Sequence, residues 1–165
     1  MSLGSAETLA LTGMMGSGKS TVARALGLLL GRRVVSLDAE IARAAGKPIP
    51  AVFAEDGEPA FRALERVAVA TLPAGVVADL GGGAFCDPES AARLLAVGRV
   101  VFLDVSAREA ARRLAAGSGV EDRPLAASWE PLLARRLPLY RRAHLAVEVD
   151  ALTPEAVARR IVGSL

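Results

Sequence analysis

A glycine-rich stretch near the start of the chain constrains the fold more than any other feature of the sequence. Residues 8–26 read TLALTGMMGSGKSTVARAL, and the segment from Gly13 to Ser20 has the spacing G-x-x-x-x-G-K-[ST]. The residues before it form an apolar run of strand length, and those after it have the apolar periodicity of a helix. A strand, a glycine-rich turn and a helix in this order are typical of an α/β protein with a parallel sheet.

The chemistry expected of this turn is phosphate binding. Its glycines allow consecutive backbone N–H groups to face phosphate oxygens, and the following helix adds the partial positive charge of its N-terminus. Lys19 is expected to reach the β- and γ-phosphates of a nucleoside triphosphate, and the Ser20 hydroxyl to bind Mg²⁺. We predict that the nucleotide contacts Met15, Gly16, Ser17, Gly18, Lys19, Ser20 and Thr21.

Apolar runs of strand length alternate with helical patterns along the chain. The expected strands are residues 8–12, 33–37, 75–80, 99–104 and 145–149. Most of them are continuous apolar runs, as in strands that helices cover on both faces. The residues that mark helix starts are Asp87–Pro88, Ser106 with Glu109, Ser128 and Thr153–Pro154. The pattern predicts a doubly wound α/β fold, in which ligands bind at the carboxyl ends of the strands.

Composition limits the classes of protein to which the chain can belong. Its 165 residues fit one domain, 1–165, and its apolar residues form no uninterrupted stretch of about 18 that would cross a membrane. The start of the chain lacks the pattern of a secretory signal, and the single cysteine, Cys86, excludes a disulfide framework. A net charge of +2 and few aromatic residues do not suit single-stranded nucleic acid. We expect a cytoplasmic protein without a nucleic-acid or membrane partner.

A second glycine-rich turn and two arginines are candidates for binding the acceptor of a phosphoryl group. Residues 81–83 are glycines at the end of an expected strand, where their N–H groups suit a carboxylate or hydroxyl, although a tight turn explains them equally well. Arg62 lies beside Phe61 on a helical pattern, and its alternative role is an ion pair with Glu58. Arg136 is the second candidate arginine, and its alternative role is a charge on the surface that binds nothing.

The segment AAGSGVEDRPLAA, at residues 115–127, has the composition of a lid. Gly117 and Gly119 are the expected hinges. Arg123 is then expected to close over the transferring phosphate and exclude water. A surface loop without a catalytic role is the alternative.

Four acids compete for the metal and the substrate. Asp38 and Glu40 follow an expected strand, and each is also explained by the capping or the dipole of a helix N-terminus. Asp79 and Asp104 end two other apolar strands, as metal-binding acids of nucleotide-binding proteins do. Asp104 is explained more simply as a turn residue, whereas Asp79 stays a candidate for the magnesium site.

These pieces together resemble shikimate kinases, small P-loop kinases of the nucleoside-monophosphate-kinase-like group. The matching segments are GMMGSGKST, SLDAEIARAAGKPIPAVFAEDGEPAFRALE, LGGGAF, DRPL and RRLPLYRRAH, in this order. The last four are more diagnostic than the phosphate loop, because they must occur together. The resemblance implies a three-layer α/β P-loop fold with a five-stranded parallel sheet, a substrate-binding helical segment at about 38–66 and a lid at about 116–127.

The resemblance also implies roles for single residues. The acceptor would be bound by Glu40, Phe61, Arg62, Gly81, Gly82, Gly83 and Arg136. ATP would meet Arg113 and Arg123 besides the phosphate loop, and Mg²⁺ would be held by Ser20 and, through a water molecule, by Asp38. The catalytic residues would be Lys19, Arg123 and Glu40, the last of which helps to deprotonate the attacking hydroxyl.

One position departs from the family, which usually has Asp-x-Asp where this chain has Asp38-Ala39-Glu40. Glu40 is one methylene longer, and a displacement of about 1 Å at a reacting centre can cost on the order of 10²-fold in rate. Either the pocket is rebuilt around Glu40, or the acceptor is another polyol or sugar acid such as gluconate. A non-catalytic nucleotide-binding module is the alternative of another class.

From motifs and resemblance together we predict a monomeric, Mg²⁺- and ATP-dependent kinase of this family. Its acceptor is expected to be a hydroxyl group of shikimate, which gives shikimate 3-phosphate and ADP in the chorismate pathway to the aromatic amino acids. The phosphate loop is the basis for predicting ATP as the phosphoryl donor, whereas the four later segments are the basis for predicting shikimate as the acceptor.

Overall fold

The computed structural model describes residues 3–117 and 129–165. In chain order the elements are β1 (Thr8–Thr12), α1 (Lys19–Leu30), β2 (Val34–Ser36), α2 (Leu37–Ala45), α3 (Ile49–Ala51), the π-helical turn η1 (Val52–Asp56), α4 (Gly57–Ala70), β3 (Val77–Asp79), the 3₁₀ turn η2 (Ala84–Cys86), α5 (Pro88–Val97), β4 (Gly98–Asp104), α6 (Ala107–Ala116), α7 (Trp129–Tyr140), β5 (Leu145–Glu148) and α8 (Pro154–Ser164). The lid expected at about 116–127, with Arg123, and the helix start expected at Ser128 lie outside the described residues, apart from Ala116 and Gly117.

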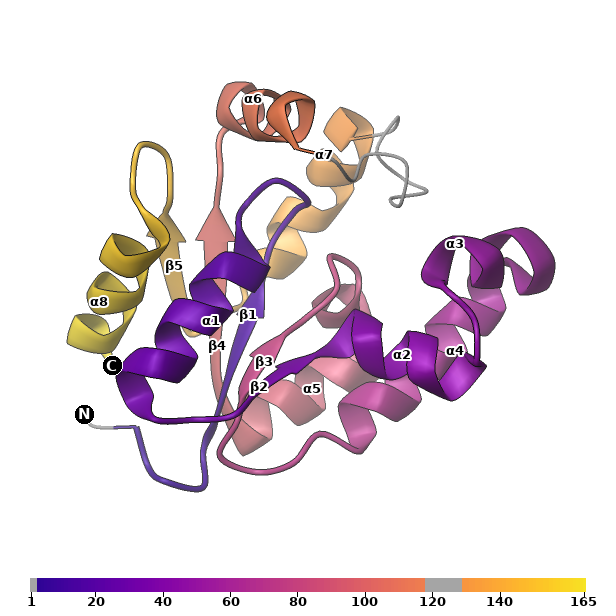
Figure 1. Ribbon diagram of the computed structural model, residues 1–165, viewed down its shortest axis with the longest axis horizontal. Coiled ribbons are helices and arrows are strands. Elements are labelled where there is room, and N and C mark those ends of the chain that lie inside the picture. The colour runs from indigo at the N-terminus through magenta and orange to yellow at the C-terminus, as the bar shows by residue number, and fades with distance from the viewer. Residues whose placement is uncertain (1–2, 118–128) are drawn as a thin grey trace.

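All five described strands are parallel and belong to one sheet with the order β2-β3-β1-β4-β5. β1 is central, and its Leu9 is paired with Val77 of β3 and with Arg99 of β4. Helices cover both faces of this sheet, so the fold has three layers (Figure 1). The predicted α/β fold with a five-stranded parallel sheet is therefore confirmed.

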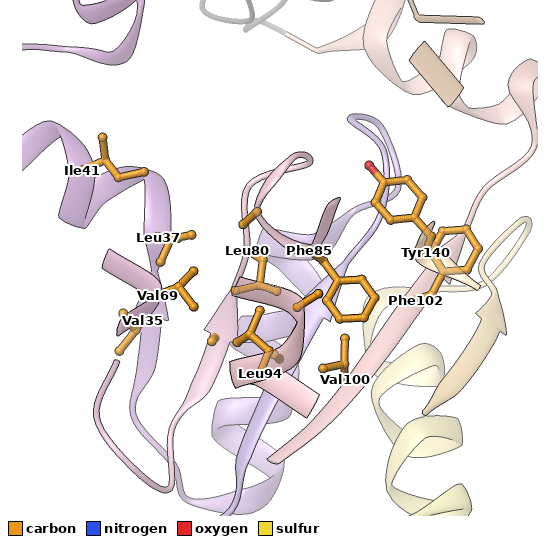
Figure 2. Packing of buried hydrophobic residues seen from close by; sticks show 14 of the residues in the cluster. Val35, Leu37, Ile41, Val69, Leu80, Phe85, Leu94, Val100, Phe102 and Tyr140 are labelled. Carbon is orange, nitrogen blue, oxygen red and sulfur yellow. The ribbon is translucent and has the colours of Figure 1, made fainter. Parts of the chain in front are cut away.

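Alternate residues of the strands pack against opposite helical layers. Ala10 and Phe102 belong to a core that includes side chains of α2, α4, α5 and α7, part of which Figure 2 shows. Leu9 and Leu11 belong to a second core with α1 and α8, which lie side by side in Figure 1. Because helices bury both faces, the strands show continuous apolar runs instead of alternation.

Side-chain caps confirm three of the predicted helix starts. Asp87, Ser106 and Thr153 each accept a hydrogen bond from the backbone N–H group three residues later, at 2.9–3.2 Å. Each cap satisfies one of the N–H groups that have no partner within the helix. Within residues 3–117 and 129–165, no helix has the length and apolar character needed to cross a membrane.

The strand predicted at 33–37 ends one residue early, and this changes the surroundings of the acids that follow. Ser36 caps α2, because its Oγ accepts a hydrogen bond from the Ala39 N–H group at 3.3 Å. Asp38 and Glu40 therefore lie in the first turn of a helix. Successive helical residues point about 100° apart, so these two side chains leave the helix about 200° apart.

Candidate active site

The loop between β1 and α1 has the shape expected of a phosphate cradle. Gly13, Gly16 and Gly18 have φ values of 144°, 86° and 85°, a conformation that strains residues with a Cβ. Lys19 Nζ donates to the carbonyl oxygens of Gly13 at 2.8 Å and of Met14 at 3.1 Å. Since α1 begins at Lys19, a helix N-terminus and an ammonium group meet at this loop.

The Ser20 hydroxyl is hydrogen-bonded to an acid from the neighbouring strand. Ser20 Oγ donates to Asp79 Oδ2 at 2.6 Å, and Asp79 is the last residue of β3, with 9% of its surface exposed. β3 pairs with β1, whose carboxyl end leads into the phosphate loop. Two oxygens of the kind that Mg²⁺ prefers therefore lie together at the base of the loop.

The glycine loop after β3 makes room for charged side chains. A Cβ added at Gly81 would lie 3.0 Å from Asp38 Oδ1, and one added at Gly82 would lie 3.0 Å from Arg136 Nη1. Both distances are tighter than normal side-chain contacts. The loop is therefore more than a tight turn, because its lack of side chains lets an acid and an arginine approach the backbone.

Arg62 approaches the third glycine of the loop and is held by two acids. A Cβ added at Gly83 would collide with the Arg62 guanidinium group. Arg62 donates to Glu58 Oε1 at 3.1 and 3.3 Å and, through Nη1, to both oxygens of Glu65 at 2.6 and 3.0 Å. The ion pair with Glu58 is thus present, but it orients Arg62 at the loop instead of leaving it on a solvated face.

Burial affects the acid that holds Arg62. Glu65 is 2% exposed, and this burial raises the pKa of its carboxyl group, an increase that the positive charge of Arg62 opposes. The Arg62 guanidinium carbon also lies 5.1 Å from the centre of the Phe61 ring, within the range of a cation–π contact. The ion pairs with Glu58 and Glu65 and the contact with the Phe61 ring therefore fix the position of the Arg62 side chain.

Arg136 and Tyr140 support the glycine loop from α7. Arg136 is 8% exposed, and Tyr140, one helical turn later, is fully buried and donates a short hydrogen bond to the Gly82 carbonyl oxygen. The Tyr140 ring stacks on Phe102 of β4, with 5.1 Å between ring centres (Figure 2). Burial raises the pKa of the Tyr140 phenol, so the group stays protonated and remains a donor.

A cavity of about 390 Å³ joins the two loops, a size suited to small ligands. Its described lining is Met15, Gly16, Gly18, Lys19, Ser20, Thr21, Ser36, Asp38, Ile49, Phe53, Phe61, Arg62, Asp79, Leu80, Gly81, Gly82, Gly83, Arg113, Leu114 and Arg136. Most of the predicted site residues are thus brought together. Ser17 is instead buried within the phosphate loop, where its Oγ has no hydrogen-bond partner among the described residues.

The structure brings Asp38 to the cavity and leaves Glu40 away from it. Glu40 is not among the described lining residues, and its Oε2 accepts hydrogen bonds from Arg43 at 2.6 and 3.2 Å. The hydrogen bond from Arg43 lowers the pKa of Glu40. Ser36, two residues before Asp38, does line the cavity. The substrate and base roles expected of Glu40 stay predictions that this arrangement does not favour.

The family model and the curated relatives agree on one family. A family model described as "Shikimate kinase" matches residues 15–165 of this chain. The chain belongs to the shikimate kinase family. A shikimate kinase from Thermobifida fusca is 45% identical over 164 residues, which cover 94% of this chain and 92% of that protein. One from Limosilactobacillus fermentum is 42% identical over 166 residues, which cover 95% and 94%, respectively.

A solved structure of the shikimate kinase family has the same fold throughout. The shikimate kinase from Acinetobacter baumannii, in complex with shikimate, has a TM-score of 0.90 and is 33% identical. The match covers 96% of this chain and 92% of that one. The resemblance drawn from the motifs is therefore confirmed, and the chain is an ATP-dependent kinase that phosphorylates a hydroxyl group of a small molecule.

Arg113, expected near the nucleotide in this kinase, contacts backbone carbonyl oxygens of the phosphate loop. Its Nη1 donates to the carbonyl oxygens of Gly16 and Ser17 at 3.3 Å, and its Nη2 to that of Val149 at 2.9 Å. Glu109 fixes the side chain through Nε at 2.7 Å. A second cavity, of about 420 Å³, lies beside Arg113 and is also lined by Thr153 and Pro154.

Three contacts in this kinase were not predicted from the sequence patterns. From the sequence, Tyr140 and Trp129 are expected to be packing or anchoring residues, without an indication of what they contact. Tyr140 donates to the glycine loop, and Trp129 Nε1 donates to the Met15 carbonyl oxygen at 3.1 Å. Ser36 reads as part of a strand, yet it caps α2 and lines the cavity. The spacing of Tyr140 four residues after Arg136 is the one signal that places both on the same helical face.

Proposed function

We propose that this chain is a shikimate kinase that transfers the γ-phosphoryl group of ATP to a ring hydroxyl of shikimate. The products are shikimate 3-phosphate and ADP, in the chorismate pathway to the aromatic amino acids. The observation that carries the proposal is the gathering of Arg62, Arg136 and Asp38 around three glycines, in the same cavity as the phosphate loop. The structural relative that contains shikimate supports the same acceptor.

The acceptor side suits a ring that carries one carboxylate and several hydroxyl groups. Arg62 and Arg136 present guanidinium groups to the carboxylate, and such charge-assisted hydrogen bonds are roughly twice as strong as neutral ones. Asp38 accepts a hydrogen bond from a ring hydroxyl. Phe61, whose ring centre lies 4.6 Å from that of Phe53, supplies an apolar wall for the ring.

Phosphoryl transfer in this site depends on positioning and on charge neutralisation. Lys19 Nζ exchanges its hydrogen bonds to loop carbonyl oxygens for bonds to phosphate oxygens. Asp38, instead of Glu40, takes the proton of the attacking hydroxyl. The hydroxyl oxygen forms a bond to the γ-phosphorus while the bond to the β–γ bridging oxygen breaks and ADP leaves. Arg113 and the lid residue Arg123 add positive charge on the nucleotide side, as the resemblance implies.

Mg²⁺ fits the oxygens on the donor side of the cavity. In the described ranges, 3–117 and 129–165, no three His, Cys, Asp or Glu side chains form a metal site of their own. This suits Mg²⁺, which commonly takes one or two protein ligands and otherwise phosphate and water oxygens. Ser20 would hold the ion through its hydroxyl, and the ion would supply positive charge to the phosphates. Asp38 is the second ligand expected from the resemblance, but its place beside Gly81 favours the acceptor.

The alternative acceptor loses its main support. Glu40 is the residue that favours another polyol or sugar acid such as gluconate, and it pairs with Arg43 outside the described lining of the cavity. We expect a monomer. The half-buried thiol of Cys86 suits the reducing cytoplasm that we expect as its location.

The test is ADP production from Mg²⁺-ATP with shikimate, with gluconate and with no acceptor. We expect turnover that depends on shikimate, and Arg62→Ala should raise the KM for shikimate about tenfold or more, since a lost hydrogen bond to a charged group costs about 1.5–3 kcal/mol. The KM for ATP should change less than about twofold. A folded protein that binds ATP and turns over only with gluconate would refute the proposal.

A further inference from the structure

We propose that Asp79, at the end of β3, is the carboxylate that holds the catalytic Mg²⁺ together with Ser20. The resemblance assigns the metal to Asp38 and the sequence leaves Asp79 as a second candidate, but the structure places Asp38 beside the acceptor loop. This inference rests on the proposed function only in requiring Mg²⁺-nucleotide as the phosphoryl donor. It divides the acids of the cavity between two tasks, with Asp79 for the donor and Asp38 for the acceptor.

The contact between Ser20 and Asp79 is the first observation. Ser20 is the hydroxyl residue of the phosphate-loop motif, and its Oγ lies 2.6 Å from Asp79 Oδ2. Ligand oxygens on adjacent corners of a magnesium octahedron lie about 3 Å apart, given bonds of about 2.0–2.1 Å. The two oxygens therefore need to separate by only a few tenths of an ångström to share one ion. A direct bond to Asp79 and one through a water molecule are both compatible with this spacing.

The position of Asp79 in the sheet is the second observation. Its Cα is paired with that of Leu11 in β1 and with that of Ser36 in β2, so it stands at the carboxyl edge, next to the strand that leads into the phosphate loop. Its neighbours Ala78 and Leu80 are fully buried, and Asp79 itself is 9% exposed. Burying a carboxylate costs free energy unless charge or hydrogen bonds compensate it, and a neutral hydroxyl does so only in part. A divalent cation supplies the compensation that this acid needs.

The other acids of the cavity edge have different surroundings. Asp38 Oδ1 lies against Gly81, and the negative charge of Asp38 contributes to the raised pKa of Glu65, one of the two acids that hold Arg62. Asp104 ends β4 and is not among the described lining residues. Ser36, the register partner of Asp79, carries a hydroxyl that caps α2. At this edge β2 thus ends in a hydroxyl and β3 in a carboxylate.

The experiment measures how strongly Mg²⁺ improves nucleotide binding. ADP is titrated calorimetrically into the full-length protein in excess Mg²⁺ and again in EDTA, and the ratio of the two dissociation constants is compared between variants. Asp79→Asn removes the charge but keeps the size and an oxygen that can accept from Ser20. We expect this variant to lose about tenfold or more of the ratio, the loss typical when a group that supports a metal site is removed. An unchanged ratio would overturn the proposal.

The matched control is Asp38→Asn, an identical change at the other acid of the cavity. It should keep the magnesium ratio and weaken binding of shikimate, whereas Asp79→Asn should leave the dissociation constant of shikimate within about twofold. Loss of the ratio in Asp38→Asn, with its retention in Asp79→Asn, would return the metal to Asp38. If Asp79→Asn does not fold, Asp79→Ser is measured in its place and read by the same criterion.

A second readout follows the metal itself. Mn²⁺ replaces Mg²⁺ in the complex with ADP, and the free ion is counted by electron paramagnetic resonance. Asp79→Asn should release Mn²⁺ at concentrations at which the unmodified protein retains it, and equal retention would contradict the proposal. Neither readout uses shikimate. A protein that fails to phosphorylate shikimate but loses its magnesium ratio in Asp79→Asn would thus refute the proposed function and leave this inference standing.

Discussion

The two loops that meet in the cavity bind their ligands by different means. The phosphate loop uses its own backbone, the N-terminus of α1 and one lysine, and all of these lie within residues 13–20. The glycine loop at residues 81–83 gives charged side chains room to approach, and those charges come from α2, α4 and α7. The first site is therefore encoded locally, whereas the second depends on packing among helices that are distant in sequence.

The largest effect is expected from the local site. Lys19→Ala removes the ammonium group that neutralises the transferring phosphate and should lower kcat by about 10²–10³-fold or more, as loss of a pre-positioned charge-stabilising group does. The other lysine of the chain, Lys47, pairs with Glu55 and Asp56 and provides the control. Steady-state kinetics of Lys19→Ala and Lys47→Ala check this prediction. Substantial turnover in folded Lys19→Ala would show that the ammonium group of Lys19 is not needed for phosphoryl transfer.

The next effect tests whether space is the main contribution of the glycine loop. Gly83→Ala should displace the Arg62 guanidinium group and raise the KM for shikimate about tenfold, because a hydrogen bond to a charged group is worth about 1.5–3 kcal/mol. The KM for ATP should change little. Gly163→Ala is the control, since a Cβ there meets nothing within 4 Å. If both variants behave alike, the close approach of Arg62 to the loop has no role in binding.

A smaller effect is expected where α7 supports the same loop. Tyr140→Phe keeps the ring on Phe102 but removes its hydrogen bond to the half-buried Gly82 carbonyl oxygen, which then keeps only the weak contact from Cys86 Sγ at 3.9 Å. The expected cost is about 0.5–1.5 kcal/mol of folding free energy. Chemical denaturation measures this loss. We also expect a modest rise in the KM for shikimate, because the loop becomes less firmly held. A stable variant with an altered KM for ATP alone would place Tyr140 in the donor site.

The same contrast explains how much could be predicted from sequence. The fold and the phosphate loop were predictable, because continuous apolar strands, helix caps and the glycine spacing are patterns of neighbouring residues. Arg62 and Arg136 could be named as candidates, but their approach to the glycines depends on how α4 and α7 pack. The contact between Ser20 and Asp79 joins the first turn of α1 to the end of β3, 59 residues apart in sequence, which no local pattern reports. Such contacts require the folded sheet.

The position of one helix start decides the roles of two acids. With a strand through Leu37, Asp38 and Glu40 follow in a loop, and both can be directed at a substrate. Because Ser36 ends the strand and caps α2, the two acids instead point about 200° apart around the helix. A shift of one residue in an element boundary, which sequence patterns do not resolve, thus changes which acid faces the cavity.

The smallest effect is expected at Glu40, and it tests where the acceptor site ends. Glu40→Gln removes a charge that pairs with Arg43 on the solvated face of α2, so kcat and the KM for shikimate should change less than about twofold. Asp38→Asn, two residues away and facing the cavity, should lower kcat/KM for shikimate by about 10²-fold, the usual contribution of a positioned general base. Steady-state kinetics with shikimate compare the two variants directly. If Glu40→Gln proves to be the more damaging change, α2 must turn during the reaction to bring Glu40 to the substrate, and the acceptor site is assembled by motion as well as by packing.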